Sequence, residues 1–146
     1  MIRKVSPDKE KALSIIKTAE SDMRFTLTLK ISEDSANTIV RNIYESFRML
    51  GEALLINKGI KIMDHVESIN ELLKLDVDTN RPIYLIENLR KLRHNINYYG
   101  YKANISEVEN AVSVAKSCFK PLLDKTMEMV RGKWKSGLNS SVHSLL

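Results

Sequence analysis

The chain has 146 residues, a net charge of +5 and 28% charged side chains. This length suits one domain with a hydrophobic core and is short for two domains. A hydrophobic content of 43% excludes an intrinsically disordered protein. The single cysteine, Cys118, excludes an internal disulfide, argues against a cysteine-based zinc site and indicates a reducing, cytoplasmic environment. No apolar run approaches the ~18 residues of a membrane span, so we expect no membrane insertion.

The first predicted helix follows Ser6 and Pro7, a capping residue and a proline suited to the first helical position. Apolar residues then recur at three- and four-residue steps, which indicates one buried helix face. That apolar stripe consists of Ala12, Ile15 or Ile16, Ala19, Met23 and Leu27. Residues 26–31 alternate briefly between polar and apolar, but they continue the helical spacing, so we interpret them as part of this helix.

The second predicted helix starts after Ser32, where Glu33 and Asp34 would interact favourably with the positive end of the helix dipole. Gly59 is a plausible C-terminal stop. The apolar stripe between them consists of Ala36, Ile39 or Val40, Ile43, Phe47, Leu50 and Leu54. A third, shorter helix is expected around residues 63–75, and its apolar residues are Val66, Ile69, Leu72 and Leu73.

A turn-rich connection over residues 76–82 leads into the fourth helix, predicted from Pro82 to Tyr99 and ended by Gly100. The fifth helix is predicted to begin at Ser106, with Glu109 completing a capping box. Pro121 should kink it near residue 117.

No strand pattern of useful length is visible, and periodicity ends near residue 132. Residues 1–131 are therefore predicted to form one domain and residues 132–146 a mobile basic tail. Several long amphipathic helices with short connections indicate an all-α, antiparallel bundle of about five helices.

Positive charge is concentrated on the fourth helix and on the tail. Residues 131–146 contribute +3 of the total +5, which leaves +2 for residues 1–130. Within that body, residues 81–102 carry five Lys or Arg against Glu87 alone, a local charge of +4. Such a patch suits an anionic partner such as RNA, a nucleotide or an acidic protein surface, although a solvated helix face is the ordinary alternative.

Arg93 falls on the apolar stripe of the fourth helix, four residues after Leu89 and three before Ile96. A charge carried toward a buried face needs an ion pair, hydrogen bonds or a wet cleft. Four-residue spacings place other polar residues along the same edge of the helix. The resulting candidate site consists of Arg90, Arg93, His94, Asn97 and Tyr98. Arginine suits phosphate, histidine suits proton transfer near neutral pH, and tyrosine can stack on a base.

The segment LRKLRHNINYYGY at residues 89–101, followed by a capped helix, resembles the signature segment of HEPN domains. The resemblance extends loosely over residues 6–130. It implies a small antiparallel helical bundle that forms a homodimer, with the signature helices facing each other across a cleft. Active HEPN proteins are metal-independent RNases that use an Arg and, after four to six intervening residues, a His. Many act with a small nucleotidyltransferase in toxin–antitoxin pairs.

By this resemblance Arg93 corresponds to the signature Arg, and His94 to the polar residue that follows it. The catalytic His is expected at Tyr98, or at Tyr99 or Gly100 with the longer spacings, and none of these positions holds a His. A tyrosine with its usual pKa near 10 is a poor base at neutral pH.

We therefore expect a catalytically degenerate HEPN-like protein, with no cofactor and no metal, that binds RNA, a nucleotide or a nucleotidyltransferase. Arg93 is the expected key cleft residue. One alternative is a divergent metal-independent RNase that uses Arg93 and His94. Another is a structural, dimerising bundle in which the polar residues only fix the helix register.

Overall fold

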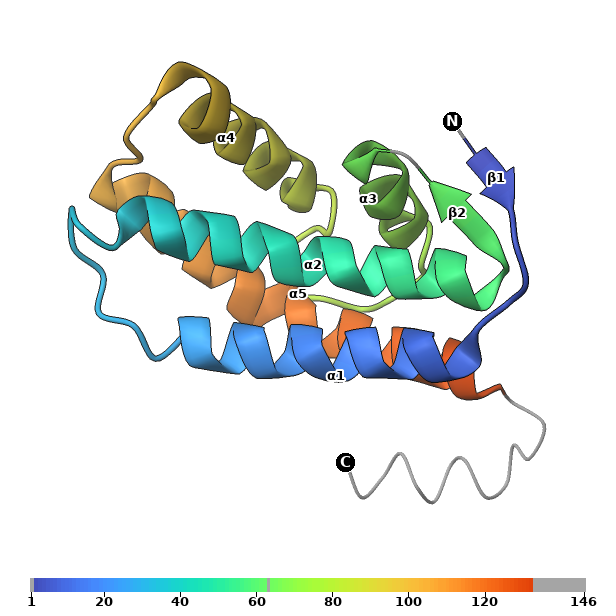
Figure 1. Ribbon diagram of the computed structural model, residues 1–146. Coiled ribbons are helices and arrows are strands. Elements are labelled where there is room, and N and C mark those ends of the chain that lie inside the picture. The colour runs from blue at the N-terminus through green and yellow to red at the C-terminus, as the bar shows by residue number, and fades with distance from the viewer. Residues whose placement is uncertain (1, 63, 133–146) are drawn as a thin grey trace.

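The structure is a computed structural model that describes residues 2–62 and 64–132. Over these residues the chain forms five helices and one two-stranded sheet (Figure 1). The elements in chain order are β1 (Ile2–Lys4), α1 (Lys9–Thr26), α2 (Ala36–Asn57), β2 (Ile60–Ile62), α3 (His65–Leu73), α4 (Leu85–Tyr99) and α5 (Ile105–Arg131). The predicted all-α helical bundle is confirmed. Residues 133–146, nearly all of the predicted tail, lie outside the described residues.

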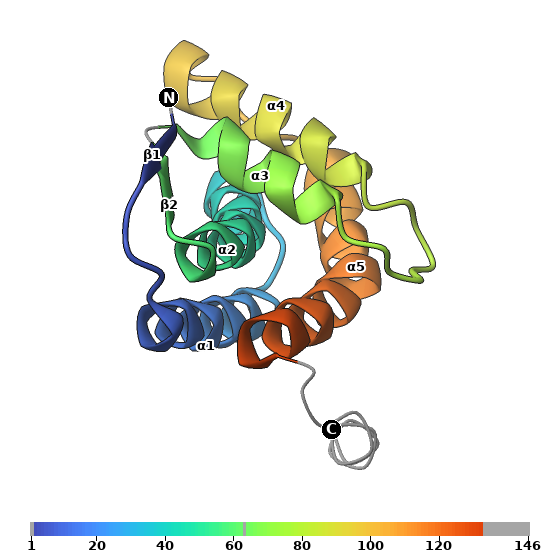
Figure 2. The same ribbon diagram turned by 90° about the vertical axis from the view of Figure 1, so that its right-hand side faces the viewer.

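Helix α2 lies at the centre of the bundle and packs against each of the other four helices. Figure 2 looks along its axis and shows α1, α3, α4 and α5 arranged around it. Figure 1 shows that α1 and α2 run side by side in opposite directions. Buried residues occupy a broad arc of α2, and Thr38, Arg41 and Glu45 lie on its less buried side, as expected for a helix that its neighbours cover over most of its circumference.

Helix α4 runs back over the N-terminal half of α2 (Figure 1). Polar contacts fix their antiparallel alignment. The Asn37 side chain, at the start of α2, donates to the Tyr101 carbonyl and accepts from the Ala103 N–H, both beyond the end of α4. One turn further along α2, Arg41 contacts Asn97. These contacts hold the C-terminal half of α4 beside α2.

Helix α3 covers the C-terminal half of α2 and approaches it unusually closely at Gly51. A Cβ atom placed on Gly51 would lie 1.9 Å from the carbonyl oxygen of Ser68. Glycine is therefore required at this point of α2, even though it lowers the intrinsic stability of a helix. The close approach lets Ile69 and Leu72 of α3 become fully buried.

The two-stranded sheet was not predicted from the sequence. Strands β1 and β2 pair antiparallel, with Lys4 opposite Ile60. Gly59 adopts a left-handed conformation (φ +76°) just after α2, and its carbonyl accepts from the N–H of Val5. Three residues per strand are too few to show a period of two, which explains why the sequence pattern does not reveal them.

The predicted limits of the first helix were wrong at both ends. It begins at Lys9, because the side chain of Asp8, rather than that of Ser6, caps it by accepting from the Lys11 N–H. It ends at Thr26, so the proposed continuation to residue 31 is a turn. At that end the hydroxyl of Thr28 donates to the carbonyl of Phe25, in competition with the helical backbone hydrogen bonds.

The predicted starts of the second and fifth helices were also displaced. Helix α2 begins three residues later than expected, because Ser32 and Ser35 hydrogen-bond to each other in the preceding turn. Helix α5 begins one residue before Ser106, and its capping box is formed by Asn104 and Glu107 instead of Ser106 and Glu109. It continues through Pro121 as one helix, so the proline does not divide it.

The third and fourth helices are shorter than predicted. Asp64 caps α3 by accepting from two backbone N–H groups, and Val66, expected on the apolar stripe, is exposed. The residues after Pro82 form a turn, and α4 begins at Leu85. The predicted stop at Gly100 is confirmed, since this residue caps α4 in the left-handed conformation.

Candidate nucleic-acid interface

The candidate residues lie on α4 from Arg90 to Tyr98, and a buried apolar face anchors this helix. Ile86, Leu89 and Ile96 face the core and are almost fully buried. Arg93 lies between the last two of these on the helix, as the sequence predicts, and is half-buried. The buried stripe therefore fixes which side of α4 carries each polar residue.

The guanidinium group of Arg93 lies over the ring of Tyr44 on α2. Its Cζ atom is 5.3 Å from the ring centroid, within the range of a cation–π contact. Among the ion pairs of the described residues, none involves Arg93. The positive charge of Arg93 is thus held in place by a neutral ring and is not cancelled by a carboxylate.

A second arginine with a neutral partner lies one turn further along the interface. The Nε of Arg41, on α2, donates to the Oδ1 of Asn97 at 2.8 Å, and both side chains are exposed. Asn97 was a predicted site residue, but Arg41 was not. Its signal in the sequence was the spacing of Arg41, Tyr44 and Arg48, which places three polar groups on one face of an otherwise apolar helix.

Tyr44 is the buried centre of this group. Only 1% of its surface is exposed, and its hydroxyl has no hydrogen-bond partner among the described residues. Burial raises the pKa of the Tyr44 hydroxyl, and the nearby charges of Arg93, Arg90 and Arg48 oppose that effect without cancelling it. The hydroxyl therefore remains protonated at neutral pH.

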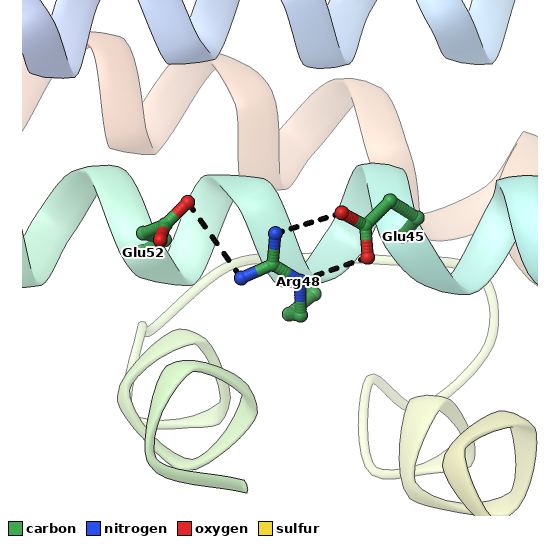
Figure 3. Close-up of polar contacts among 3 residues, drawn as sticks. All are labelled: Glu45, Arg48 and Glu52. Carbon is green, nitrogen blue, oxygen red and sulfur yellow. Dashed lines mark hydrogen bonds and ion pairs between the residues drawn. The ribbon is translucent and has the colours of Figure 1, made fainter. Parts of the chain in front are cut away.

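Two other arginines near Tyr44 are neutralised by acids. Arg90, a predicted site residue, pairs with Glu87 at 2.6 Å on its own helix. Arg48, which was not predicted, is 9% exposed and makes two hydrogen bonds to Glu45 and an ion pair to Glu52 (Figure 3). The hydrogen bond to Glu45 raises the pKa of Arg48 despite the opposing effect of burial.

His94 and Tyr98 lie on a different side of α4 from the contact between Arg93 and Tyr44. The His94 ring lies 4.6 Å from that of Tyr98 and 5.8 Å from that of Tyr99, measured between centroids. Tyr98 and Tyr99 are 70% and 76% exposed. The structure thus divides the predicted band, because Arg93 and Asn97 contact α2, whereas His94 and Tyr98 contact each other and solvent.

Two further observations bear on the class of site. The described residues contain no group of three or more His, Cys, Asp or Glu side chains placed to hold a metal ion. Over the same residues, no helix combines the length and the apolar character needed to cross a bilayer. In the described residues, α4 carries arginines and exposed aromatic rings.

Comparisons of the chain with protein-family models, with curated proteins and with solved structures find no match. The fold and the site define an all-α bundle with a cationic and aromatic surface where α4 meets α2. The HEPN resemblance of residues 89–101 remains an expectation from the sequence.

Proposed function

We propose that the protein is a HEPN-like cytoplasmic bundle that binds RNA on the α4 surface without cleaving it. The observation that carries the proposal is the state of two arginines. Arg41 and Arg93 are held by a neutral amide and a neutral ring, so their charges remain available to phosphate groups. Arginine suits this role because its planar fork donates two hydrogen bonds at once and stays protonated.

The surroundings of these arginines add to the positive potential. Lys91 and Lys102 are exposed near the two ends of this half of α4, and no ion pair of the described residues involves either. Charges that no acid compensates attract a polyanion over a Debye length. This supports an extended anionic ligand rather than a single small ion.

Exposed aromatic rings would supply the contacts to bases. Tyr98, Tyr99 and His94 form a cluster of rings at the C-terminal end of α4. Unpaired bases stack on such rings with little regard to sequence. Tyr101 is held by a hydrogen bond to Glu107 and is less exposed than Tyr98 and Tyr99. The ligand we propose is therefore single-stranded RNA.

The proposal excludes catalysis because the position of the expected catalytic His holds Tyr98. The divergent-RNase alternative needs Arg93 and His94 to act on one phosphate. Their side chains have different partners, Tyr44 for Arg93 and Tyr98 with Tyr99 for His94. The structural alternative has one observation in its favour, the contact of Arg93 with the buried ring of Tyr44.

As part of the same proposal, the protein acts as a homodimer with the two α4 surfaces lining one cleft, and a small nucleotidyltransferase is its partner in a toxin–antitoxin-like pair. The HEPN resemblance suggests both. The exposed rings of Tyr98 and Tyr99 supply apolar surface of the kind that is enriched in protein interfaces.

The test uses labelled single-stranded RNA in the presence of EDTA, with the wild-type protein and the variants Arg93→Ala and His94→Ala. Arg24→Gln is the matched control, because it removes an exposed positive charge on α1, on the far side of α2 from α4 (Figure 1). We expect retarded migration without cleavage, weakened by salt and by Arg93→Ala but not by Arg24→Gln.

Two results would replace the proposal. RNA cleavage that disappears in both Arg93→Ala and His94→Ala would establish the divergent RNase. Neither binding nor cleavage, together with dissociation of a dimer by Arg93→Ala in sedimentation analysis, would establish the structural bundle.

A further inference from the structure

A second arginine-lined site lies away from the α4 surface, where the connection between α3 and α4 crosses α5. Three hydrogen bonds fix the backbone of Arg81 there, one with the neighbouring Thr79 and two with α5. The Arg81 N–H donates to the Oγ of Ser117 at 2.7 Å, and its carbonyl accepts from the Sγ of Cys118 at 3.3 Å. Contacts within the protein therefore hold this part of the connection against α5 without a ligand.

The guanidinium group of Arg81 also has neutral partners only. Its Nη1 donates to the Oδ1 of Asn110 at 3.0 Å and to the Oγ of Ser113 at 3.1 Å. These bonds use both hydrogens of Nη1. Among the hydrogen bonds of the described residues, none uses the hydrogens on Nε or Nη2 of Arg81. None of the ion pairs of this part of the chain includes Arg81. The group is oriented and carries its full charge.

This guanidinium borders a surface hollow of about 490 Å³. The hollow is lined by Asn80, Arg81, Glu109, Val112, Ser113, Lys116 and Ser117. Lys116 is exposed and adds a second positive charge, whereas Glu109 is the only acid of the lining. Two positive charges and one negative charge leave a net charge of +1, and the serine hydroxyls add hydrogen-bonding groups.

We propose that this hollow binds the phosphate group of a small phosphate ester. The unused hydrogens of Arg81 form a fork that matches two oxygens of a tetrahedral oxyanion. Lys116 supplies a point charge, and the hydroxyl of Ser113 can donate to a third oxygen. The Arg81 fork would engage both oxygens of a carboxylate ligand, whereas a phosphate ester keeps a third oxygen for Ser113. The site involves α5 and the connection before α4, so it stands independently of RNA binding at the C-terminal end of α4.

The experiment is an NMR titration of the full ¹⁵N-labelled chain, following the backbone amides of Ser113, Lys116 and Ser117. The probes are inorganic phosphate, adenosine monophosphate and adenosine. We expect saturable shifts at these amides with both phosphate-containing probes and none with adenosine. Tighter binding of the monophosphate identifies the ester as the ligand, and equal binding identifies free phosphate. Shifts with adenosine alone, or none with any probe, overturn the proposal.

Two variants, one that removes a positive charge and one that removes a negative charge, distinguish phosphate binding from a purely structural role of Arg81. Lys116→Gln should weaken phosphate binding about five-fold, and Glu109→Gln should strengthen it about three-fold, as expected for charges at an exposed site. Both side chains are exposed, so the fold should survive. Lys17→Gln, on the exposed side of α1, is the control and should change nothing. Equal affinity in Lys116→Gln, Glu109→Gln and the wild type would contradict the proposal.

Discussion

The two halves of α2 differ in whether acids pair with the arginines beside them. Toward its C-terminal end, Arg48 is surrounded by acids, and the buried carboxylate of Glu71 on α3 accepts from two lysines. Toward its N-terminal end, Arg93 meets a neutral ring and Arg41 a neutral amide. A charge that is paired with an opposite charge stabilises the fold, and its electrostatic attraction for a ligand is weak. An uncompensated charge contributes less to the fold and remains available to a ligand, and this difference supports the α4 surface as the proposed site.

The largest expected effect concerns the close packing of α2 and α3. Replacing Gly51 by alanine places a methyl group 1.9 Å from the backbone oxygen of Ser68, and backbone cannot move aside as a flexible side chain can. We expect a loss of about 3 kcal/mol or more in the free energy of unfolding, measured by urea denaturation.

Gly100→Ala, just after α4, is the matched control. Gly100 has φ +64°, and a methyl group added there would meet no atom within 4 Å, so only the left-handed backbone penalises the change. The expected loss is about 1 kcal/mol. Equal losses in the two variants would show that the contact between Gly51 and Ser68 does not determine stability.

The second prediction separates the two classes of arginine. Arg48→Met removes the buried guanidinium that contacts Glu45 and Glu52, and we expect it to lower the free energy of unfolding by about 2 kcal/mol. That value lies below the cost of breaking a fully buried pair because both acids are partly exposed. RNA affinity, measured by fluorescence anisotropy, should remain within about two-fold of the wild type. A large loss of affinity in a folded Arg48→Met protein would remove the distinction between the two halves of α2.

The third prediction concerns the exposed rings. Tyr98→Ala should weaken binding of single-stranded RNA about five-fold, since one stacked base contributes about 1 kcal/mol. Tyr84→Ala is the control, because Tyr84 is 65% exposed but lies before the N-terminal end of α4. In anisotropy titrations Tyr98→Ala should bind RNA more weakly than Tyr84→Ala. Similar affinities would show that the position of the Tyr98 ring does not contribute to binding.

The smallest effect is the pH dependence contributed by Glu71. Burial alone would raise the pKa of this carboxyl, but hydrogen bonds from Lys58 and Lys74 outweigh burial and lower it. A carboxyl with a lowered pKa in the folded state stabilises the protein above its ordinary pKa, and the contribution disappears as the pH falls through the folded-state value.

Glu71→Gln should therefore be less stable than the wild type at pH 7, and the difference should shrink as the pH falls below about 4. Urea denaturation of both proteins at a series of pH values measures this. A difference that is constant with pH would exclude an ionised, lysine-bonded Glu71 as the cause.

The fold class could be predicted from the sequence because helical periodicity is a local property. The stripe around Ile39, Ile43 and Phe47 required no knowledge of the rest of the chain. The ends of the helices were harder to predict, because several residues that could cap a helix lie close together in the sequence. In the folded chain the backbone positions Asp8, and not Ser6, to accept from the first turn of α1. In the same way it positions Asn104, and not Ser106, to cap α5.

The candidate site could be predicted only in part, for a similar reason. The position of Arg93 on an apolar stripe was visible, but its partner Tyr44 lies on another helix. Arg41 was missed because its contact with Asn97 spans 56 residues. The predicted grouping of His94 with Arg93 relied on helical spacing alone, which does not show which side α2 would occupy.

The most direct test of the central claim is the RNA affinity of the double variant Arg41→Gln/Arg93→Gln. Both replaced charges have neutral partners, so the free energy of unfolding should change by no more than about 1 kcal/mol. We predict at least about a ten-fold loss of affinity for single-stranded RNA and a shallower dependence on salt. An unchanged affinity and salt dependence in the folded double variant would contradict the account.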